Sequence, residues 1–124
     1  MIDVQGVDYI RIPATDIAAS TRFYGEILGL PAGPTQHHDW AEYQAGNVTL
    51  AVMTPETHGD TFEPLTPSTF ALGVPDVAEA RIELEGRGVA FDGDILDTGV
   101  CHMAFFKDPD GNQLMLHRRY APRG

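Results

Sequence analysis

The most constraining feature of this sequence is an internal repeat. Asp16 and Asp76, which lie 60 positions apart, each follow an alternating apolar segment and each precede a segment with helical spacing of apolar residues. Each aspartate is predicted to be a helix N-cap, because its side chain can accept hydrogen bonds from the first free N–H groups of a helix. Three strand-like segments follow each predicted helix. A repeat of this kind determines the architecture more firmly than the propensity of any single segment.

The two halves contain the same series of predicted elements. Those of the first half are a strand over 9–12, a helix over 17–28 that ends at Gly29, and strands over 34–38, 40–45 and 48–53. Those of the second half are a strand over 70–74, a helix that begins after Asp76 and ends at Gly86, and strands over 89–94, 100–106 and 113–117. Turn signals at 46–47 and 108–111 separate neighbouring strands.

This series predicts an α+β fold made of two tandem βαβββ modules. We expect one domain over residues 1–124, with modules at 7–54 and 69–118 and a connector at 54–68 that is rich in Pro, Thr and acidic residues. Each helix covers one face of a small sheet. The opposite faces are expected to curl around a shared cavity, with the helices outside.

The composition excludes several classes of function. The formal net charge of −10 and the pI near 4.6 disfavour binding to nucleic acid or to an anionic membrane surface. No apolar segment approaches the roughly 20 residues that span a bilayer, and the first residues do not resemble a signal peptide. The single cysteine, Cys101, cannot form an internal disulfide and is expected to be an inert strand residue. We therefore expect a cytoplasmic protein.

Two segments resemble those of a known family. The opening YIRIPATDIAASTRFYGEILGL and the ending FFKDPDGNQLML, together with the repeat, are similar to the vicinal oxygen chelate superfamily. That group includes glyoxalase I, extradiol dioxygenases, fosfomycin-resistance enzymes and bleomycin-resistance proteins. The resemblance covers nearly the whole chain and implies the same fold, a small-molecule ligand and, as an expectation from the family, a homodimer.

The resemblance also identifies four positions at which metal-dependent members carry His, Gln or carboxylate ligands. These positions hold Tyr9, Ala51, Thr69 and Met115 in this chain. Alanine, threonine and methionine do not replace imidazole and carboxylate as ligands of divalent Mg, Mn, Ni or Zn. We therefore predict no metal cofactor. The prediction depends on strand register, which is fixed by the requirement that the flanking leucines and valines face the helices.

Strand alternation predicts which side chains face the cavity. The expected ligand-binding residues are Tyr9, Arg11, Trp40, Thr49, Met53, Thr69, Gln113 and Met115. Trp40 and Tyr9, with the two methionines, form a lining suited to a flat or aromatic ligand, although they can equally fill a core. Arg11 needs a carboxylate, which either a ligand or Glu42 can supply, and we expect Glu42.

A pair of histidines is the main candidate for chemistry. If Asp108 to Gly111 form the loop, Lys107 pairs with Asn112 and His117 faces His102 on one side of the sheet. Such a pair can be solvated at the rim without a chemical role, or it can act in acid–base catalysis. It can also form a displaced metal site, for which the third ligand would be Glu42, Tyr9 or His38.

Three functions are compatible with these residues. The first is a metal-free protein that binds a small planar or carboxylate-bearing molecule. The second is a metal-independent isomerase or lyase with His102, His117 and Glu42 as catalytic residues. The third is a metal-dependent glyoxalase or dioxygenase with displaced ligands. His58, in the connector, is expected to have no partner of the ligand type.

Overall fold

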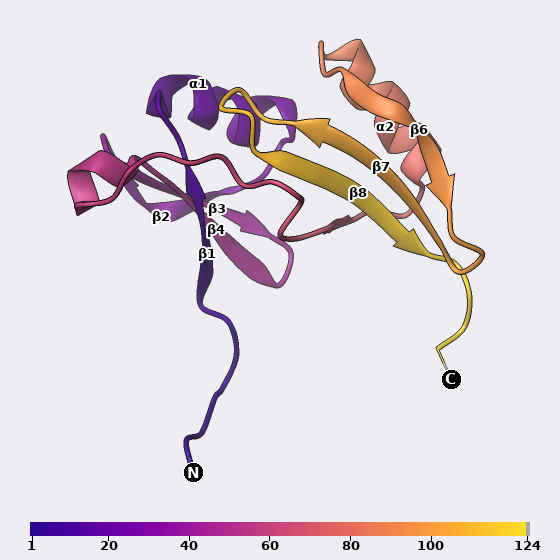
Figure 1. Ribbon diagram of the computed structural model, residues 1–124, viewed down its shortest axis with the longest axis horizontal. Coiled ribbons are helices and arrows are strands. Elements are labelled where there is room, and N and C mark those ends of the chain that lie inside the picture. Colours follow the sequence, from indigo (N-terminus) through magenta and orange to yellow (C-terminus); the bar gives the residue numbers. More distant parts are fainter. Residues whose placement is uncertain (124) are drawn as a thin grey trace. The chain divides into compact units, whose positions relative to one another are not determined.

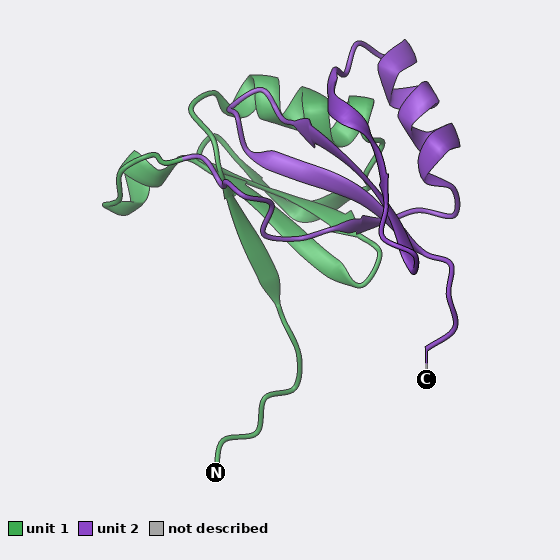
Figure 2. Ribbon diagram, turned by 45° about the vertical axis from the view of Figure 1, so that its right-hand side comes forward, with its two compact units in different colours: residues 1–63 green, residues 64–124 purple. Residues whose placement is uncertain are grey.

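The computed structural model describes residues 1–123, which form two compact units. Unit 1 comprises residues 1–63 and unit 2 comprises residues 64–124 (Figure 2). The boundary falls inside the predicted connector. Each unit contains one four-stranded sheet and helical segments, so the α+β class is confirmed.

Unit 1 begins with an extended N-terminal arm, residues 1–8, that runs away from the first strand (Figure 1). Its elements are β1 (Tyr9–Pro13), α1 (Ile17–Thr21), the π-helix η1 (Arg22–Ile27), β2 (Ala32–His37), β3 (Trp40–Ala45), β4 (Val48–Met53) and the 3₁₀-helix η2 (Pro55–His58). The strands are ordered β1-β4-β3-β2. β1 is parallel to β4, and the other neighbours are antiparallel.

Unit 2 repeats this topology. Its elements are β5 (Leu72–Gly73), α2 (Val77–Gly86), β6 (Phe91–Asp97), β7 (Cys101–Lys107) and β8 (Gln113–Arg119). The strands are ordered β5-β8-β7-β6, and β5 is parallel to β8. The tandem βαβββ repeat inferred from the two aspartates is therefore confirmed.

Both predicted N-caps are formed. The side chain of Asp16 accepts hydrogen bonds from the N–H groups of Ala18 and Ala19, and that of Asp76 accepts one from Glu79. These bonds satisfy N–H groups that a helix leaves free at its start.

The first helix widens after α1 instead of continuing as one α-helix to residue 28. The N–H of Leu28 donates to the carbonyl of Phe23, five residues back, as in a π-turn. The wider segment passes close to β3, because a Cβ at Gly25 would lie 3.1 Å from Cε1 of Tyr43. Sequence spacing does not distinguish such a turn from a regular helix.

Each core lies between a sheet and its helix. In unit 1 the buried residues include Ile12, Leu50 and Val52 from the strands, and Phe23 and Tyr24 from the helical segment. In unit 2 the buried residues are Ala104, Phe106, Leu114 and Leu116 from the strands, and Val77 and Leu84 from α2. The alternating leucines and valines face the helices, as predicted. This register places the intervening residues on the opposite face of each sheet.

The predicted register of the last hairpin is wrong by one residue. Lys107 pairs with Gln113 and not with Asn112, so the loop has five residues, 108–112. Asn112 belongs to the loop because its carbonyl accepts from the N–H of Asp108 and its amide bonds the Asp108 carboxylate at 2.7 Å. One extra loop residue turns one strand over relative to its predicted partner. His117 therefore pairs with Met103, and the predicted pairing with His102 does not form.

Other boundaries differ less. The strand predicted over 70–74 is reduced to β5, so Thr69 lies before the sheet. The strand predicted over 89–94 begins and ends later, and Gly93, at φ 72°, lies where its register shifts. The connector contains the short helix η2, which starts at Pro55. No helix in residues 1–123 is long and apolar enough to cross a membrane.

Candidate functional site

The face of the unit 1 sheet opposite α1 collects most of the predicted ligand-binding residues. We call it the open face of unit 1. Backbone pairing arranges its residues in three rows: Tyr9, Thr49 and Gln44; Arg11, Ala51 and Glu42; and Pro13, Met53 and Trp40. Six of the eleven predicted site residues therefore share one surface, and the alternation argument is confirmed for this sheet.

Two aromatic rings meet over the middle of this face. The rings of Tyr9 and Trp40 contact edge to face, with centroids 5.3 Å apart. Their rows lie on either side of the row that contains Ala51, whose side chain is a single methyl group and is fully buried. The small residue leaves room for the rings to approach. Tyr9 remains 49% exposed, so the pair presents an aromatic surface to solvent.

The charged residues of this face have partners different from those predicted. The indole N–H of Trp40 donates to Oε2 of Glu42 at 2.9 Å. Arg11 does not form the expected ion pair with Glu42; its Nη1 lies 4.0 Å from Oδ2 of Asp60. Both side chains are more than half exposed, so this pair contributes little to stability and leaves Arg11 available for exchange.

His58 has partners that sequence reasoning missed. Its Nε2 lies 3.7 Å from Oδ2 of Asp39, and its ring centroid lies 5.6 Å from that of Trp40. The helix η2 and the residues after it therefore bring His58 and Asp60 onto the open face. Pro55 at the first turn of η2 was a usable signal, because proline favours the start of a helix.

The four family metal positions do not offer a suitable donor set. Ala51 has no donor atom and is buried beneath the rings, while Thr69 and Met115 supply only a hydroxyl and a thioether. Divalent Mg, Mn, Ni and Zn ions are held in proteins chiefly by imidazole, thiolate and carboxylate groups. No group of three or more His, Cys, Asp or Glu side chains in residues 1–123 is arranged to hold a metal ion. The residues present do not fit such an ion.

In unit 2, Gln113, Met115 and His117 share the face of the sheet opposite α2, which we call the open face of unit 2. Gln113 accepts a hydrogen bond from the N–H of Ser68 at 2.9 Å, so its carbonyl is used to hold the chain before β5. Met115 pairs with Phe105. Of the predicted residues on this face, His117 is the one with an ionisable side chain.

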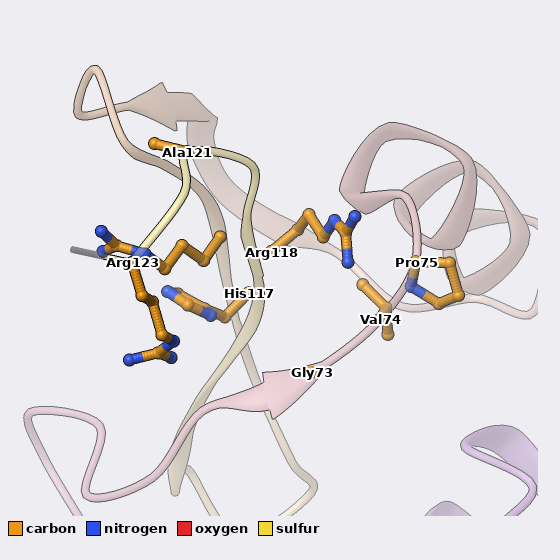
Figure 3. A pocket seen from close by; sticks show the side chains of 8 residues that line it. Gly73, Val74, Pro75, His117, Arg118, Ala121 and Arg123 are labelled. Atoms are coloured by element: carbon orange, nitrogen blue, oxygen red, sulfur yellow. The ribbon is translucent and has the colours of Figure 1, made fainter.

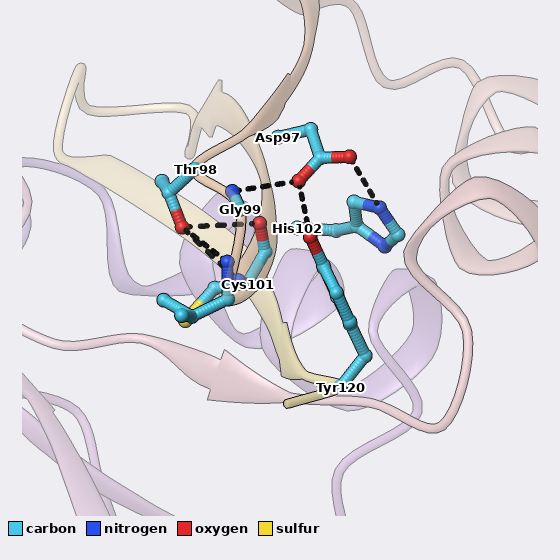
Figure 4. A network of polar contacts seen from close by, with 7 residues as sticks. Asp97, Thr98, Gly99, Cys101, His102 and Tyr120 are labelled. Atoms are coloured by element: carbon cyan, nitrogen blue, oxygen red, sulfur yellow. Dashed lines mark hydrogen bonds and ion pairs between the residues drawn. The ribbon is translucent and has the colours of Figure 1, made fainter. Parts of the chain in front are cut away.

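His102 lies on the other face of the unit 2 sheet, in a polar network at the β6–β7 turn (Figure 4). Its Nε2 is 3.4 Å from Oδ2 of Asp97, and its ring lies 4.8 Å from that of Tyr120. The Tyr120 hydroxyl donates to Oδ1 of Asp97 at 2.7 Å. The N–H of Gly99 and then this hydroxyl lower the pKa of Asp97, and the same bond raises the pKa of Tyr120.

The predicted histidine pair is therefore wrong as a geometric unit. His102 and His117 occupy opposite faces of β7 and β8, so they do not form the side-by-side pair on which the acid–base and displaced-metal hypotheses relied. The assignment of His102, His117 and Glu42 as catalytic residues stays a prediction.

A comparison with known protein families shows to which superfamily the chain belongs. Residues 6–116 match the model of the Glyoxalase/Bleomycin resistance protein/Dioxygenase superfamily. The chain belongs to this superfamily. The resemblance inferred from the opening and closing segments is thus confirmed.

Individual relatives show the range of this superfamily. The chain is 29% identical over 129 residues to the uncharacterized protein YaeR of Escherichia coli (strain K12), a match that covers 96% of this chain and 100% of YaeR. It is similar to TnmS3, an antibiotic binding protein from Streptomyces sp. CB03234, with 26% identity, a TM-score of 0.77 and coverage of 96% and 99% of the two chains. Lactoylglutathione lyase from Agrobacterium tumefaciens shares the fold at 15% identity, with a TM-score of 0.78 and coverage of 93% and 94%.

Proposed function

We propose that this superfamily member is a small-molecule-binding protein that holds a planar, carboxylate-bearing ligand on the open face of unit 1 without a metal ion. The observation that carries the proposal is the partly exposed Tyr9–Trp40 pair beside Arg11. An aromatic ligand can stack on or insert beside such rings, which favour offset or edge-to-face contacts. The fold and the family membership agree with this function but leave the ligand open.

Arg11 supplies the polar part of the proposed site. Its pairing with Asp60 is long, at 4.0 Å, and solvent-exposed, so a ligand carboxylate that binds both guanidinium nitrogens can replace it at little cost. Glu42 is engaged by Trp40 and does not compete for Arg11. The 26% identity to an antibiotic-binding protein also supports a binding function.

The test uses a planar probe and its saturated counterpart. The chain has one tryptophan, so the indole N–H of Trp40 gives one identifiable NMR signal at the proposed site. We expect 2-naphthoate to shift this signal in a saturable manner. Decahydro-2-naphthoate has the same carboxylate but no aromatic face, and it should bind at least about tenfold more weakly.

Substitutions of Trp40 distinguish the contribution of its aromatic ring to binding from that of its indole N–H. Trp40→Leu should abolish saturable binding by calorimetry, whereas Trp40→Phe keeps a ring and should retain most of it. Arg11→Gln should weaken binding by about tenfold, which corresponds to the loss of one charge-assisted contact. Equal affinity for the two naphthoates, or unchanged affinity in Trp40→Leu, would show that this face is not the binding site.

The homodimer expected from the family also belongs to this proposal. The N-terminal arm exposes Ile2, Val4 and Val7 at 84%, 73% and 63%, and apolar groups exposed in this way favour contact with another surface. We expect sedimentation analysis to give a dimer whose dissociation constant rises when these three residues are replaced by serine. A monomer in the parent protein would contradict this expectation.

A further inference from the structure

The arginines of this chain divide into two groups. Four of them have a carboxylate partner: Arg11 with Asp60, Arg22 with Glu26, Arg81 with Glu85, and Arg87 with Glu83. The other three, Arg118, Arg119 and Arg123, lie close together in sequence at the end of unit 2 and pair with no carboxylate in residues 1–123. In a chain with a net charge of −10, three neighbouring cations without acidic partners need an explanation.

These arginines line a cavity of about 580 Å³ at the end of β8 (Figure 3). His117 and Arg119 project from the same face of β8, and Arg123 from the tail that follows it lies on the same side of the strand as His117. Gly73 pairs with His117 across the parallel β5–β8 ladder, and a Cβ at Gly73 would meet nothing within 4 Å. Gly73 therefore borders open space next to His117. Arg118 projects from the opposite face of β8.

Arg119 is held in place but keeps a free donor. Its Nη2 donates to the carbonyl of Pro122 at 3.1 Å, which fixes the guanidinium against the tail. Its Nε is buried and has no hydrogen-bond partner in the described part of the chain. A buried N–H without an acceptor is unfavourable, so a ligand oxygen that reaches this atom would stabilise the bound state.

The tail that carries Arg123 is anchored independently of any ligand. The N–H groups of Tyr120 and Ala121 donate to the carbonyl of Val100 at 3.1 and 3.2 Å, and the Tyr120 hydroxyl donates to Asp97 at 2.7 Å. These bonds place the residues after β8 beside the sheet. The cationic wall of the cavity is thus part of the folded unit, and little ordering is required when an anion binds.

We propose that this cavity is an oxyanion-binding site in which Arg119 and Arg123, with His117, hold a phosphate or carboxylate group. Arg119 provides a positioned guanidinium with an unused N–H, and planar guanidinium groups bind such oxygens in pairs. The inference stands on unit 2 alone. It goes beyond the proposed aromatic site of unit 1, so either can fail without the other.

The test observes the arginine Nε–H signals directly by NMR. Inorganic phosphate is titrated into the full chain at constant ionic strength maintained with KCl. We expect the Arg119 signal to shift and saturate at millimolar concentration, while KCl alone produces no saturable shift. The same titration is repeated with phenyl phosphate. If phenyl phosphate binds more tightly than inorganic phosphate, the site holds the anionic group of an organic molecule. If the two bind equally, the site holds the free ion. Both results support an oxyanion site.

Charge-matched variants make the result specific. Arg119→Gln and Arg123→Gln should each weaken phosphate binding by about tenfold, the effect of losing one charge-assisted hydrogen bond. Lys107→Gln is the control, because it removes the same charge at the far end of β7. Arg119 pairs with Cys101, and Lys107 lies six residues from Cys101, or about 20 Å along the strand. It should change binding less than twofold.

Two results would overturn the proposal. One is a linear, unsaturated response of Arg119 to phosphate. The other is an equal loss of binding in Lys107→Gln and Arg119→Gln, which would indicate a general charge effect. If Arg119→Gln does not fold, Arg119→Lys preserves the charge but loses the planar fork and the Nε–H, and it should still weaken binding.

Discussion

The two units share a topology but use their open faces differently. Both sheets have a parallel first pair and the same strand order. Unit 1 contains nine acidic residues and two arginines, and both arginines are paired. Unit 2 contains nine acidic residues and six basic ones, and three arginines at its end remain without a carboxylate in residues 1–123. Positive charge is thus concentrated in the second half of an acidic chain.

The difference follows from what each face has to satisfy. Positions that face the helices are apolar in both halves, as Ile12 beside Val52 and Leu72 beside Leu116 show, because they bury the core. The open faces carry no such requirement. Unit 1 therefore has the indole of Trp40 and the carboxylate of Glu42 at the positions where the register of unit 2 places Met103 and Phe105. A repeated fold does not imply a repeated site.

The hairpin turns differ in the same way. β3 and β4 are joined by the two exposed residues Gly46 and Asn47, with Gly46 at φ 60°. β7 and β8 are joined by five residues that include the fully buried Asn112. The amide of Asn112 donates to Asp108 at 2.7 Å and accepts from the N–H of Leu65 at 2.8 Å, which ties the start of unit 2 to the loop.

The largest predicted effect tests this contrast. Asn112→Ala should lower the free energy of unfolding by about 2–4 kcal/mol, because it removes the amide donor to Oδ2 of the nearly buried Asp108 and the side-chain acceptor of the Leu65 N–H. Asn47→Ala, at the corresponding exposed turn of unit 1, should change it by less than about 0.5 kcal/mol. Urea denaturation of the two variants measures both values.

If Asn112→Ala and Asn47→Ala lowered the free energy of unfolding by similar amounts, the distinction between a structural loop and a simple turn would not hold. Asn112→Asp is a useful companion variant, since it preserves shape but sets a second carboxylate against Asp108. At neutral pH this variant should be at least as destabilised as Asn112→Ala. At low pH, when the carboxyls are protonated, its stability relative to the parent should increase.

Local patterns predicted much of the fold. The N-caps at Asp16 and Asp76, the strands β3 and β4 and the helix-facing apolar residues follow from periodicity and capping chemistry, which act over a few residues. The loop at 108–112 was mispredicted because its length depends on Asn112, whose partners include Leu65, 47 residues away. A single residue of loop length then moved His102 to the opposite face from His117.

The site was predictable where alternation alone decides the face and unpredictable where distant segments meet. Tyr9, Arg11, Trp40 and Glu42 were placed on one face from their spacing. The predicted partner of Arg11, Glu42, was wrong because the observed partner, Asp60, comes from the connector, whose sequence has no periodicity. The contact of His58 with Trp40 was missed for the same reason.

The next prediction concerns the anchor of the cationic tail. Contacts with Gly99 and Tyr120 lower the pKa of Asp97 below its ordinary value of 3.8, so its ionised form favours the folded state. That stabilisation is present above pH 3.8 and is lost as the pH falls through the lowered pKa. Asp97→Asn should therefore have a lower melting temperature than the parent at pH 7, and the difference should narrow below pH 3.8.

Hydrogen exchange gives the local readout. In Asp97→Asn and Tyr120→Phe, the amides of Tyr120 and Ala121, which bond Val100, should exchange faster than in the parent. Tyr9→Phe is the matched control in unit 1 and should leave these amides unchanged. A melting-temperature difference that stays constant down to pH 2 would contradict the role of the Asp97 carboxylate.

The smallest predicted effect on stability is the one that most directly tests why the two units differ. Asp60→Asn removes the partner of Arg11, and the exposure of both side chains predicts a change of less than about 0.5 kcal/mol in the free energy of unfolding. The Arg11 Nε–H signal should then respond to phosphate more strongly than in the parent. Glu26→Gln frees Arg22 on an exposed helical surface and should give no saturable response, because an isolated cation is not a site. If the Arg11 signal does not respond, removal of the carboxylate partner does not create an anion site, and carboxylate supply alone cannot explain the contrast with Arg119.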